Sequence, residues 1–211
     1  MNLTLEQLVE RTVEKVKETL DSSIEIEASG RHVHLSEEAI EVLFGKGYKL
    51  TPIKYLSQPN QFAAKERVSL IGPKGVLHQV AVLGPARTKN QVEVSLADTR
   101  KLGVKAPLRL SGDIEGSPGI LLMAGENTLY LKEGLIVAKR HIHVKENDAE
   151  KLQVKDKEIV MVKVNGARPL VFDDVVVRIS PYYETFMHID HDEANACGFT
   201  SKLRGRILKK E

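Results

Sequence analysis

Hydrophobic and polar positions change their spacing once along the chain, near residue 23. Residues 1–20 repeat apolar side chains every three or four positions, with Glu, Lys and Arg between them. This spacing predicts an amphipathic helix, followed by a short polar linker at 21–23. The helix either packs on its own domain or docks its apolar stripe into a partner's groove. Its apolar positions are Leu5, Leu8, Val9, Val13, Val16 and Leu20.

After residue 23 the pattern is typical of short strands. Apolar and polar side chains alternate at 24–29, and Val- and Ile-rich runs follow at 158–164 and 175–179. Gly and Pro at 72–75 separate two apolar runs, which predicts a hairpin turn. Helices are expected only at 36–44, with Ser36 as N-cap and an end near Gly45, and at 97–102. The basic stretch 202–210 is expected to be a solvated tail. Many short strands with few helices favour small barrels or sandwiches.

The chain also contains an internal repeat. The segment Arg31-His32-Val33-His34-Leu35 returns 109 residues later as Arg140-His141-Ile142-His143-Val144. Residues 80–103 align with 175–198 without a gap, and both segments begin Val-x-Val and end in Gly. The sequence therefore predicts a mainly β fold with two related small β-barrel domains, short helices and an N-terminal amphipathic helix. The expected parts are 1–23 for the helix and linker, 24–115 for the first barrel and 116–211 for the second, with approximate boundaries and strands open to exchange between the barrels.

Composition excludes several classes of protein. Hydrophobic residues make up 42% of the chain, enough for a core, yet no run approaches the roughly eighteen apolar residues of a membrane span. The net charge of +2 and the absence of Trp argue against binding nucleic acid through bulk charge or base stacking. A single cysteine, Cys197, excludes an intrachain disulfide and favours a reducing compartment, so the cytoplasm is expected.

The repeated histidines are the main candidates for chemistry. Because side chains alternate faces along a strand, His32 and His34 project to one side, as do His141 and His143. One His-x-His pair is weak evidence, since many such pairs are ordinary polar-face residues. Its recurrence at corresponding places, each time after Arg, predicts that both pairs bind metal.

The gapless alignment nominates a third ligand for each pair. Glu93 falls opposite His188, which gives one set of His32, His34 and Glu93 and another of His141, His143 and His188. Three N and O ligands with an open fourth position are typical of catalytic zinc. The same groups accept cobalt, nickel or iron.

Arg87 is a candidate for binding an anionic substrate. It lies six residues before Glu93, after a Gly84-Pro85 turn that is placed to direct it toward the metal site. A guanidinium presents a planar fork of donors that suits phosphate or carboxylate. A surface arginine in a loop is an equally good reading of the sequence alone.

Taken together, these motifs resemble the phosphate propanoyltransferases of the propanediol-utilisation type, the microcompartment-type phosphotransacylases. The matching segments cover nearly the whole chain after residue 24, in a specific order. They are RHVHLS at 31–36, LSQPNQFAA at 56–64, GPKG at 72–75, LGPARTKNQVEVS at 83–95, RLSG at 109–112, IVAKRHIH at 136–143 and MHIDHDEANA at 187–196. Ala81 and His191 depart from the family pattern, where an arginine and a threonine are common.

The resemblance implies two β-barrels, two divalent metals that are normally zinc, and acyl transfer between coenzyme A and inorganic phosphate. The acyl group would be propanoyl or acetyl. The metal at His32, His34 and Glu93 would face the coenzyme A sulfur, and the metal at His141, His143 and His188 would face phosphate. Arg87 matches a phosphate-binding arginine and Ser111 a serine beside the reaction centre. Positions that match the coenzyme A site are Ser29, Lys54, Leu83 and Asn195.

The resemblance also implies where in the cell the protein acts and which proteins it contacts. Residues 1–20 resemble an encapsulation peptide, which implies microcompartment shell or lumen proteins as partners and the bacterial cytoplasm or microcompartment lumen as location. Acyl-CoA and phosphate are the expected small-molecule partners, and an oligomer is compatible with the sequence. A two-metal acyl-CoA thioesterase is the alternative enzyme, and a non-catalytic metal-binding module is the third reading.

Overall fold

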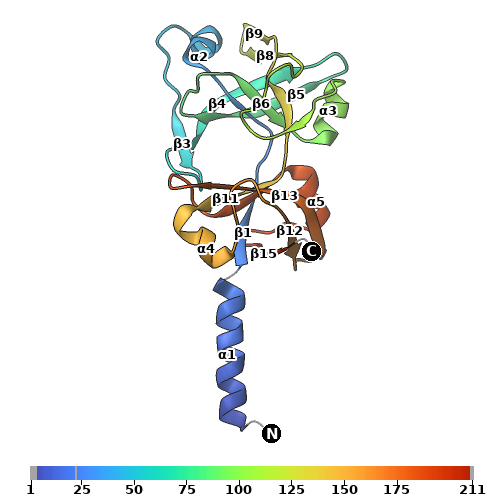
Figure 1. Ribbon diagram of the computed structural model, residues 1–211. Coiled ribbons are helices and arrows are strands. Elements are labelled where there is room, and N and C mark those ends of the chain that lie inside the picture. The colour runs from blue at the N-terminus through green and yellow to red at the C-terminus, as the bar shows by residue number, and fades with distance from the viewer. Residues whose placement is uncertain (1–3, 22, 210–211) are drawn as a thin grey trace.

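The computed structural model of the chain describes residues 4–21 and 23–209 and is mainly β, as expected (Figure 1). A long helix at the N-terminus projects away from two stacked β units. The helices are α1 (Leu5–Asp21), α2 (Glu37–Phe44), α3 (Leu96–Leu102), η1 (Glu146–Asp148), α4 (Ala149–Leu152) and α5 (His191–Cys197). The strands are β1 (Ser23–Ala28), β2 (His32–His34), β3 (Pro52–Tyr55), β4 (Phe62–Ile71), β5 (Val76–Gly84), β6 (Gln91–Val94), β7 (Leu108–Arg109), β8 (Ile120–Ala124), β9 (Asn127–Leu131), β10 (Leu135–Ala138), β11 (His141–Lys145), β12 (Ile159–Val164), β13 (Leu170–Ser180), β14 (Phe186–Ile189) and β15 (Arg204–Leu208).

The strands form one closed and one open unit. Six strands close into a barrel in the order β1-β14-β11-β13-β12-β15, and β15 pairs back onto β1. The other nine form a curled half-barrel sheet in the order β7-β10-β6-β2-β5-β4-β8-β9, with β3 paired to β4. The expected mainly β fold is thus confirmed, with one unit fully closed and the other open.

The two sheets do not follow the order of the chain, because each contains strands from the other part of the sequence. The strand β1 belongs to the barrel, whereas β8, β9 and β10 belong to the open sheet. The chain therefore passes between the units twice, at 29–31 and at 139–140, and each passage leads into a His-x-His strand. This is an exchange of strands between the units of the kind that the sequence analysis allows, and the division into 24–115 and 116–211 stays a prediction.

The repeat extends to the register of the strands. In the open sheet, β2 pairs parallel with β5 and antiparallel with β6, so that His32 lies opposite Glu93. In the barrel, β11 pairs parallel with β13 and antiparallel with β14, so that His141 lies opposite His188. The cross-strand partners of the two histidines, Glu93 and His188, are the residues that the gapless sequence alignment sets opposite each other. The two units are therefore related in local structure as well as in sequence.

Local sequence signals explain the short helices. Both expected helices are confirmed, and α2 begins after the Ser36 cap, whose hydroxyl accepts from the Ala39 amide, and ends at Gly45. The helix α5 was not expected, although Asp190 and Glu193 form a capping box and Gly198 ends it in the left-handed conformation, with φ of 63°.

The C-terminal expectation is wrong. Residues 204–208 are not a solvated tail but the strand β15, which closes the barrel between β1 and β12. Alternating charged side chains hid this strand, because only its inward face is apolar and Gly205 occupies one buried position. Residue 210 of the predicted tail lies outside the described residues.

At the other end, the helix predicted over 1–20 is confirmed from Leu5 onward as α1, while positions 1–3 lie outside the described residues. The side chains of Leu5, Leu8, Val9 and Val13 are all exposed, while those at 14–22 lie outside the described side chains. The expected linker at 21–23 is wrong at both ends, since position 21 ends α1 and position 23 begins β1, and position 22 lies outside the described residues. In the described part of the chain no helix combines the length and apolar character needed to cross a membrane.

Each His-x-His strand buries its middle residue in the core of its own unit. Val33 belongs to the core of the open sheet and Ile142 to the core of the barrel, and both are fully buried. The histidines on either side must therefore face the opposite way, out of the core. The two cores thus fix the direction in which the candidate ligands point.

This arrangement makes Ile142 a sensitive position for stability. The Ile142→Ala variant is expected to lower the free energy of unfolding by about 2–5 kcal/mol, because it leaves a cavity in the barrel core. Denaturant unfolding measures the change. The matched variant Ile53→Ala, at a side chain 58% exposed on β3, is expected to cost less than about 1 kcal/mol. Equal effects at both positions would contradict the burial argument.

Candidate active site

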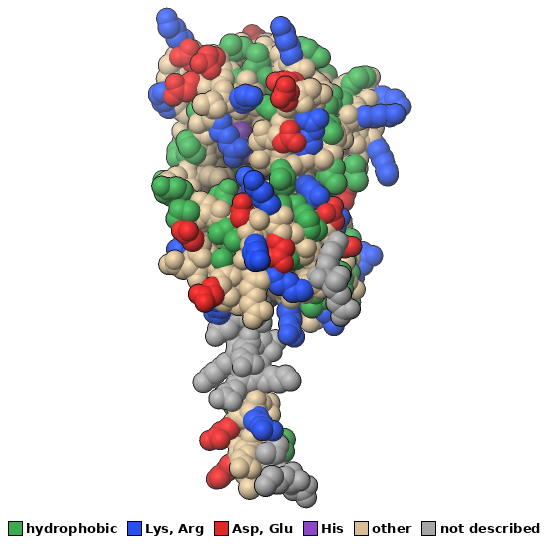
Figure 2. Space-filling model, viewed as in Figure 1, with side chains coloured by type: hydrophobic (Ala, Val, Ile, Leu, Met, Phe, Trp, Pro, Cys, Tyr) green, Lys and Arg blue, Asp and Glu red, His purple; other side chains and the backbone are tan. Residues whose placement is uncertain are grey.

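A cavity of about 340 Å³ lies between the barrel and the open sheet and is lined from both. All six predicted metal ligands line it, together with the ends of the two passages between the units. On the face seen in Figure 2, acidic and basic side chains are interspersed, and a histidine is visible in purple in a recess between them. The duplicated strands therefore present their histidines to one shared space.

The first cluster consists of His32, His34 and Glu93. One ligand atom from each lies within 4.8 Å of the others. The Nδ1 group of His32 lies 2.8 Å from the carbonyl oxygen of Gly30 and donates to it, so its Nε2 atom faces Glu93 at 3.5 Å. The Nδ1 atom of His34 is buried and has no hydrogen-bond partner among the described residues.

The second cluster consists of His141, His143 and His188. Its ligand atoms also lie within 4.8 Å of one another, and His143 Nδ1 is 3.2 Å from His188 Nε2. The Nδ1 group of His141 donates to the carbonyl oxygen of Lys139 at 2.9 Å. This bond repeats the one between His32 and Gly30, so in both clusters the first histidine uses Nδ1 for a backbone contact and keeps Nε2 for other partners.

The electrostatics of the first cluster favour an ionised carboxylate. Burial by itself would raise the pKa of Glu93, but the neighbouring His32 holds that pKa well below its usual range. Burial would lower the pKa of His32, and the Glu93 carboxylate outweighs it, so the pKa is raised. Burial, with the charge of His32, lowers the pKa of His34 well below its usual value.

In the second cluster all three imidazoles are held neutral. Burial, followed by the proximity of His141, lowers the pKa of His143 to about 2 and that of His188 to about 3. Burial also lowers the pKa of His141. Neutral imidazoles with free lone pairs are the form that binds a metal ion.

Both clusters fit a divalent cation. Leaving a buried nitrogen such as His34 Nδ1 without a partner costs about 1–3 kcal/mol, and a cation at this position would remove that cost. In the second cluster, the facing nitrogens of His143 and His188 are likewise lone-pair donors close enough to share one ion. Three N and O donors per cluster are the set found around catalytic zinc.

The structure places most, but not all, of the other predicted site residues at the cavity. Arg87, Ser111, Ser29 and Leu83 line it. Lys54 and Asn195 do not belong to its lining: Lys54 is exposed on β3, and Asn195 is exposed on α5. The contacts expected of these two residues with coenzyme A stay predictions.

Arg87 is anchored at the cavity by a backbone hydrogen bond, and its guanidinium lies among charged side chains. Its amide donates to the carbonyl oxygen of Leu35 at 2.9 Å, which anchors the loop after β5 beside β2. Burial lowers the pKa of its guanidinium, an effect that Glu93 partly opposes and Arg178 reinforces. The guanidinium groups of Arg31, Arg87 and Arg178 thus line the same cavity as the buried Glu93 carboxylate.

Ser111 is tied to the first cluster through Gln91, which the sequence analysis did not single out. The Gln91 side-chain amide donates to Ser111 Oγ at 2.8 Å and to Glu93 Oε1 at 2.5 Å. Its Oε1 atom accepts from the Gly112 amide at 2.7 Å. The signal was present, because Gln91 lies two positions before Glu93 and so shares its strand face.

Arg178 and Tyr183 were also missed. Arg178 on β13 lies opposite His143 in the register, and the ring of Tyr183 lies 4.1 Å from that of His143. In the repeat, Arg178 corresponds to Leu83, so the first half offered no charged counterpart. Their role at the cavity could not be read from the duplication.

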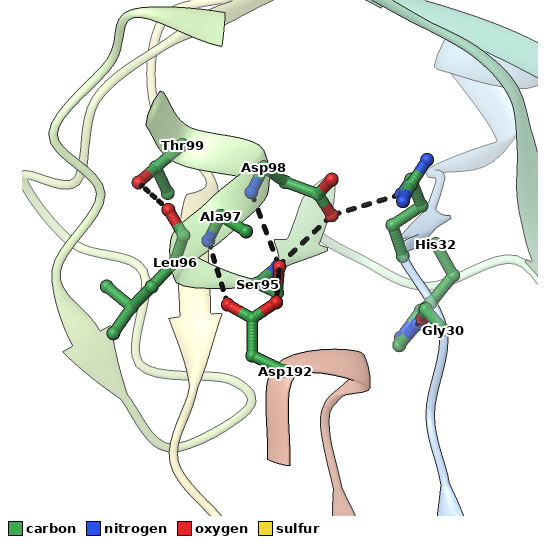
Figure 3. A network of polar contacts seen from close by, with 9 residues as sticks. Gly30, His32, Ser95, Leu96, Ala97, Asp98, Thr99 and Asp192 are labelled. Carbon is green, nitrogen blue, oxygen red and sulfur yellow. Dashed lines mark hydrogen bonds and ion pairs between the residues drawn. The ribbon is translucent and has the colours of Figure 1, made fainter. Parts of the chain in front are cut away.

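A polar network joins the two units beside the first cluster (Figure 3). Asp192 reaches from α5 to the start of α3, where it accepts from the Ser95 hydroxyl at 3.1 Å and from the Ala97 amide at 2.8 Å. Asp98 on α3 accepts from Arg31 at 3.0 Å. These contacts fix the segment that carries His32 against both units.

Fold and site together define a class: a two-unit β protein whose duplicated strands bring two candidate cation sites into one cleft. Within that class, the chain belongs to the phosphate propanoyltransferase family, whose model matches residues 25–200. The resemblance noted from the motifs is thereby confirmed, and the chain is a phosphate acyltransferase.

The similarity to known proteins covers almost the whole chain. Phosphate propanoyltransferases from Listeria monocytogenes and Enterococcus faecalis are 58% and 56% identical over 206 residues, which cover 97% and 98% of both chains respectively. A phosphate propanoyltransferase from Clostridioides difficile is 53% identical over 210 residues and matches the full length of both chains.

Proposed function

We propose that the chain transfers a propanoyl or acetyl group reversibly between coenzyme A and inorganic phosphate, at a site that binds two divalent cations, preferably zinc. The observation that carries this proposal is the pair of three-ligand clusters around one cavity that also contains Arg87. Arg31 in the cavity lining is paired with Asp98, and the other two guanidinium groups, of Arg87 and Arg178, suit a dianionic phosphate.

The residues fit the two cations in distinct roles. His32, His34 and Glu93 would hold the ion on the coenzyme A side, and the second cluster would hold the ion on the phosphate side. When bound, the two ions supply Lewis acidity, which favours the thiolate form of coenzyme A and offsets the negative charge of phosphate.

The remaining chemistry needs no nucleophile from the protein. A phosphate oxygen attacks the thioester carbonyl carbon, the new C–O bond forms, and the C–S bond then breaks to release coenzyme A as the thiolate. Arg87 orients phosphate for this attack through its fork of N–H groups. Ser111 accepts from Gln91 and also helps to hold the pKa of Glu93 low through a hydrogen bond; turned toward the substrate instead, its hydroxyl would donate to the carbonyl oxygen as charge develops there.

Release of coenzyme A in the presence and absence of phosphate tests the proposal. Transfer predicts phosphate-dependent release, with an acyl phosphate that hydroxylamine traps, and two cations per chain by elemental analysis. Release at the same rate without phosphate would instead indicate a thioesterase and overturn the proposal.

For α1 we propose a role as an address helix that docks onto microcompartment proteins in bacteria. Its described apolar side chains are exposed, and it projects away from both units (Figure 1). Exposed apolar side chains on an amphipathic helix suit insertion into a partner's groove. The proposed location is thus the cytoplasm or the microcompartment lumen.

Deletion of residues 1–20 is expected to leave acyl transfer intact. None of the described side chains of α1 lines the cavity, so kcat and KM should stay within about twofold of the full chain, a change below roughly 0.5 kcal/mol. Steady-state kinetics with acyl-CoA and phosphate measure both values. Loss of turnover in a truncated chain with an unchanged circular dichroism spectrum would contradict a purely addressing role.

A further inference from the structure

We propose that Ser57 and Gln58 of the open sheet's unit are positioning residues for the second cluster, which lies in the barrel. This inference rests on the proposed two-cation function. It concerns a motif that neither the mechanism nor the predicted ligands account for, the loop between β3 and β4.

The loop is a closed turn that reaches the cavity. The Leu56 amide donates to the Gln61 carbonyl oxygen at 3.0 Å, and the Gln61 amide donates to the Gln58 carbonyl oxygen at 3.2 Å. Ser57 and Gln58 both line the cavity, and Gln58 is only 5% exposed. A turn closed in this way limits where the two side chains can extend.

One contact from the loop leads to His188. The Ser57 hydroxyl donates to Glu27 Oε2 at 2.5 Å, and the same oxygen lies 3.5 Å from His188 Nδ1. Glu27 on β1 is the register neighbour of His188 on β14. A carboxylate on Nδ1 keeps the proton there, which leaves the Nε2 lone pair free to face the cation.

A second contact from the loop leads to His143. The Gln58 side-chain amide donates to the Glu184 carbonyl oxygen at 3.0 Å and accepts from the Glu184 backbone amide at 3.4 Å. The adjacent residue, Tyr183, places its ring 4.1 Å from that of His143, at an angle of 31°. The bridge therefore holds the aromatic surface against which this imidazole packs.

The two clusters differ in where this support comes from. In the second cluster, two of three ligands are oriented by groups that the other unit holds in place. In the first cluster, Glu93 is held by Gln91 of the same strand. Loss of the loop contacts should therefore weaken the second cluster and leave the first unchanged.

Zinc titration of single-cluster proteins separates these outcomes. The His34→Ala background keeps only the second cluster intact, and the His143→Ala background keeps only the first. Adding Ser57→Ala or Gln58→Ala to the His34→Ala background is expected to weaken Zn²⁺ binding about tenfold or more, as measured by competition with a chromophoric chelator. The same additions to the His143→Ala background are expected to leave the affinity unchanged.

Two controls distinguish positioning from general loosening of the fold. Ser57→Thr keeps the hydroxyl and is expected to retain the affinity of the His34→Ala background. Asp192→Ala removes a different contact between the units, one that touches no ligand of the second cluster, and is expected to have no effect on that affinity. A loss with Asp192→Ala equal to that with Ser57→Ala would overturn the inference.

Different experimental results would overturn the inference and the proposed function. If the full chain takes up two Zn²⁺ ions but the loop variants leave the second-cluster affinity intact, with folding confirmed by circular dichroism, positioning by the loop is wrong and the function stands. If the full chain takes up no Zn²⁺, the proposed function is overturned and the inference with it.

Discussion

The His143→Ala variant is expected to bind one divalent cation per chain in place of two and to lose about 10³-fold in kcat, or roughly 4 kcal/mol of transition-state stabilisation. The imidazole that it removes lies 3.2 Å from His188 and packs on Tyr183. Only two ligands would then remain at the second cluster, too few to retain the ion during dialysis. Elemental analysis after dialysis and steady-state turnover measure the two effects.

The matched control for this change is His78→Ala. His78 is exposed on β5, where its ring bonds with the Ser69 hydroxyl at 3.0 Å, and it does not line the cavity. Cation content and turnover are both expected to match those of the full chain. A His143→Ala protein with two bound cations, or with undiminished turnover, would rule out the second cluster as a metal site.

Replacement of Arg87 by alanine is expected to act on phosphate in particular. Two hydrogen bonds to a charged oxygen acceptor would be lost, about 3 kcal/mol in all, so kcat/KM for phosphate should fall roughly 10²-fold. The KM for acyl-CoA should change little. Varying each substrate at a saturating concentration of the other measures the two constants separately.

Two further arginine variants serve as comparisons for Arg87→Ala. Arg87→Lys keeps the charge but loses the planar fork, so an intermediate kcat/KM for phosphate is expected. Arg100→Ala removes an exposed arginine on α3, away from the cavity lining, and is expected to leave all constants unchanged. If Arg87→Ala raised only the KM for acyl-CoA, its assignment to phosphate would be incorrect.

The sequence predicted the two ligand sets because duplication and strand alternation act together. Alternation places His32 and His34 on one face, and the repeat selects Glu93 and His188 as equivalent partners. The structure brings each set of three within 4.8 Å. Whether either set binds an ion stays a prediction, to which the unpartnered nitrogen of His34 lends physical support.

What the sequence could not supply depends on contacts between distant parts of the chain. The bond from Ser57 to Glu27 joins residues 30 positions apart, and the bridge from Gln58 to Glu184 spans 126 positions. Neither contact follows from a periodic pattern of residues, and neither pair of residues is repeated in the other half of the sequence. Arg178 was missed for a related reason, since its equivalent in the repeat is apolar.

The exchange of strands also determines how the two units are connected. The whole open sheet is inserted into the barrel sequence between β1 and β11, while β1 and β15 pair at the chain ends, Ser23 opposite Arg206. Two short segments, 29–31 and 139–140, connect the inserted unit to the barrel, and each runs into a His-x-His strand. Any displacement of one unit against the other would therefore act on the segments that carry His32 and His141, so the contacts that Ser57, Gln58 and Asp192 make across the units also stabilise the spacing of the two ligand clusters.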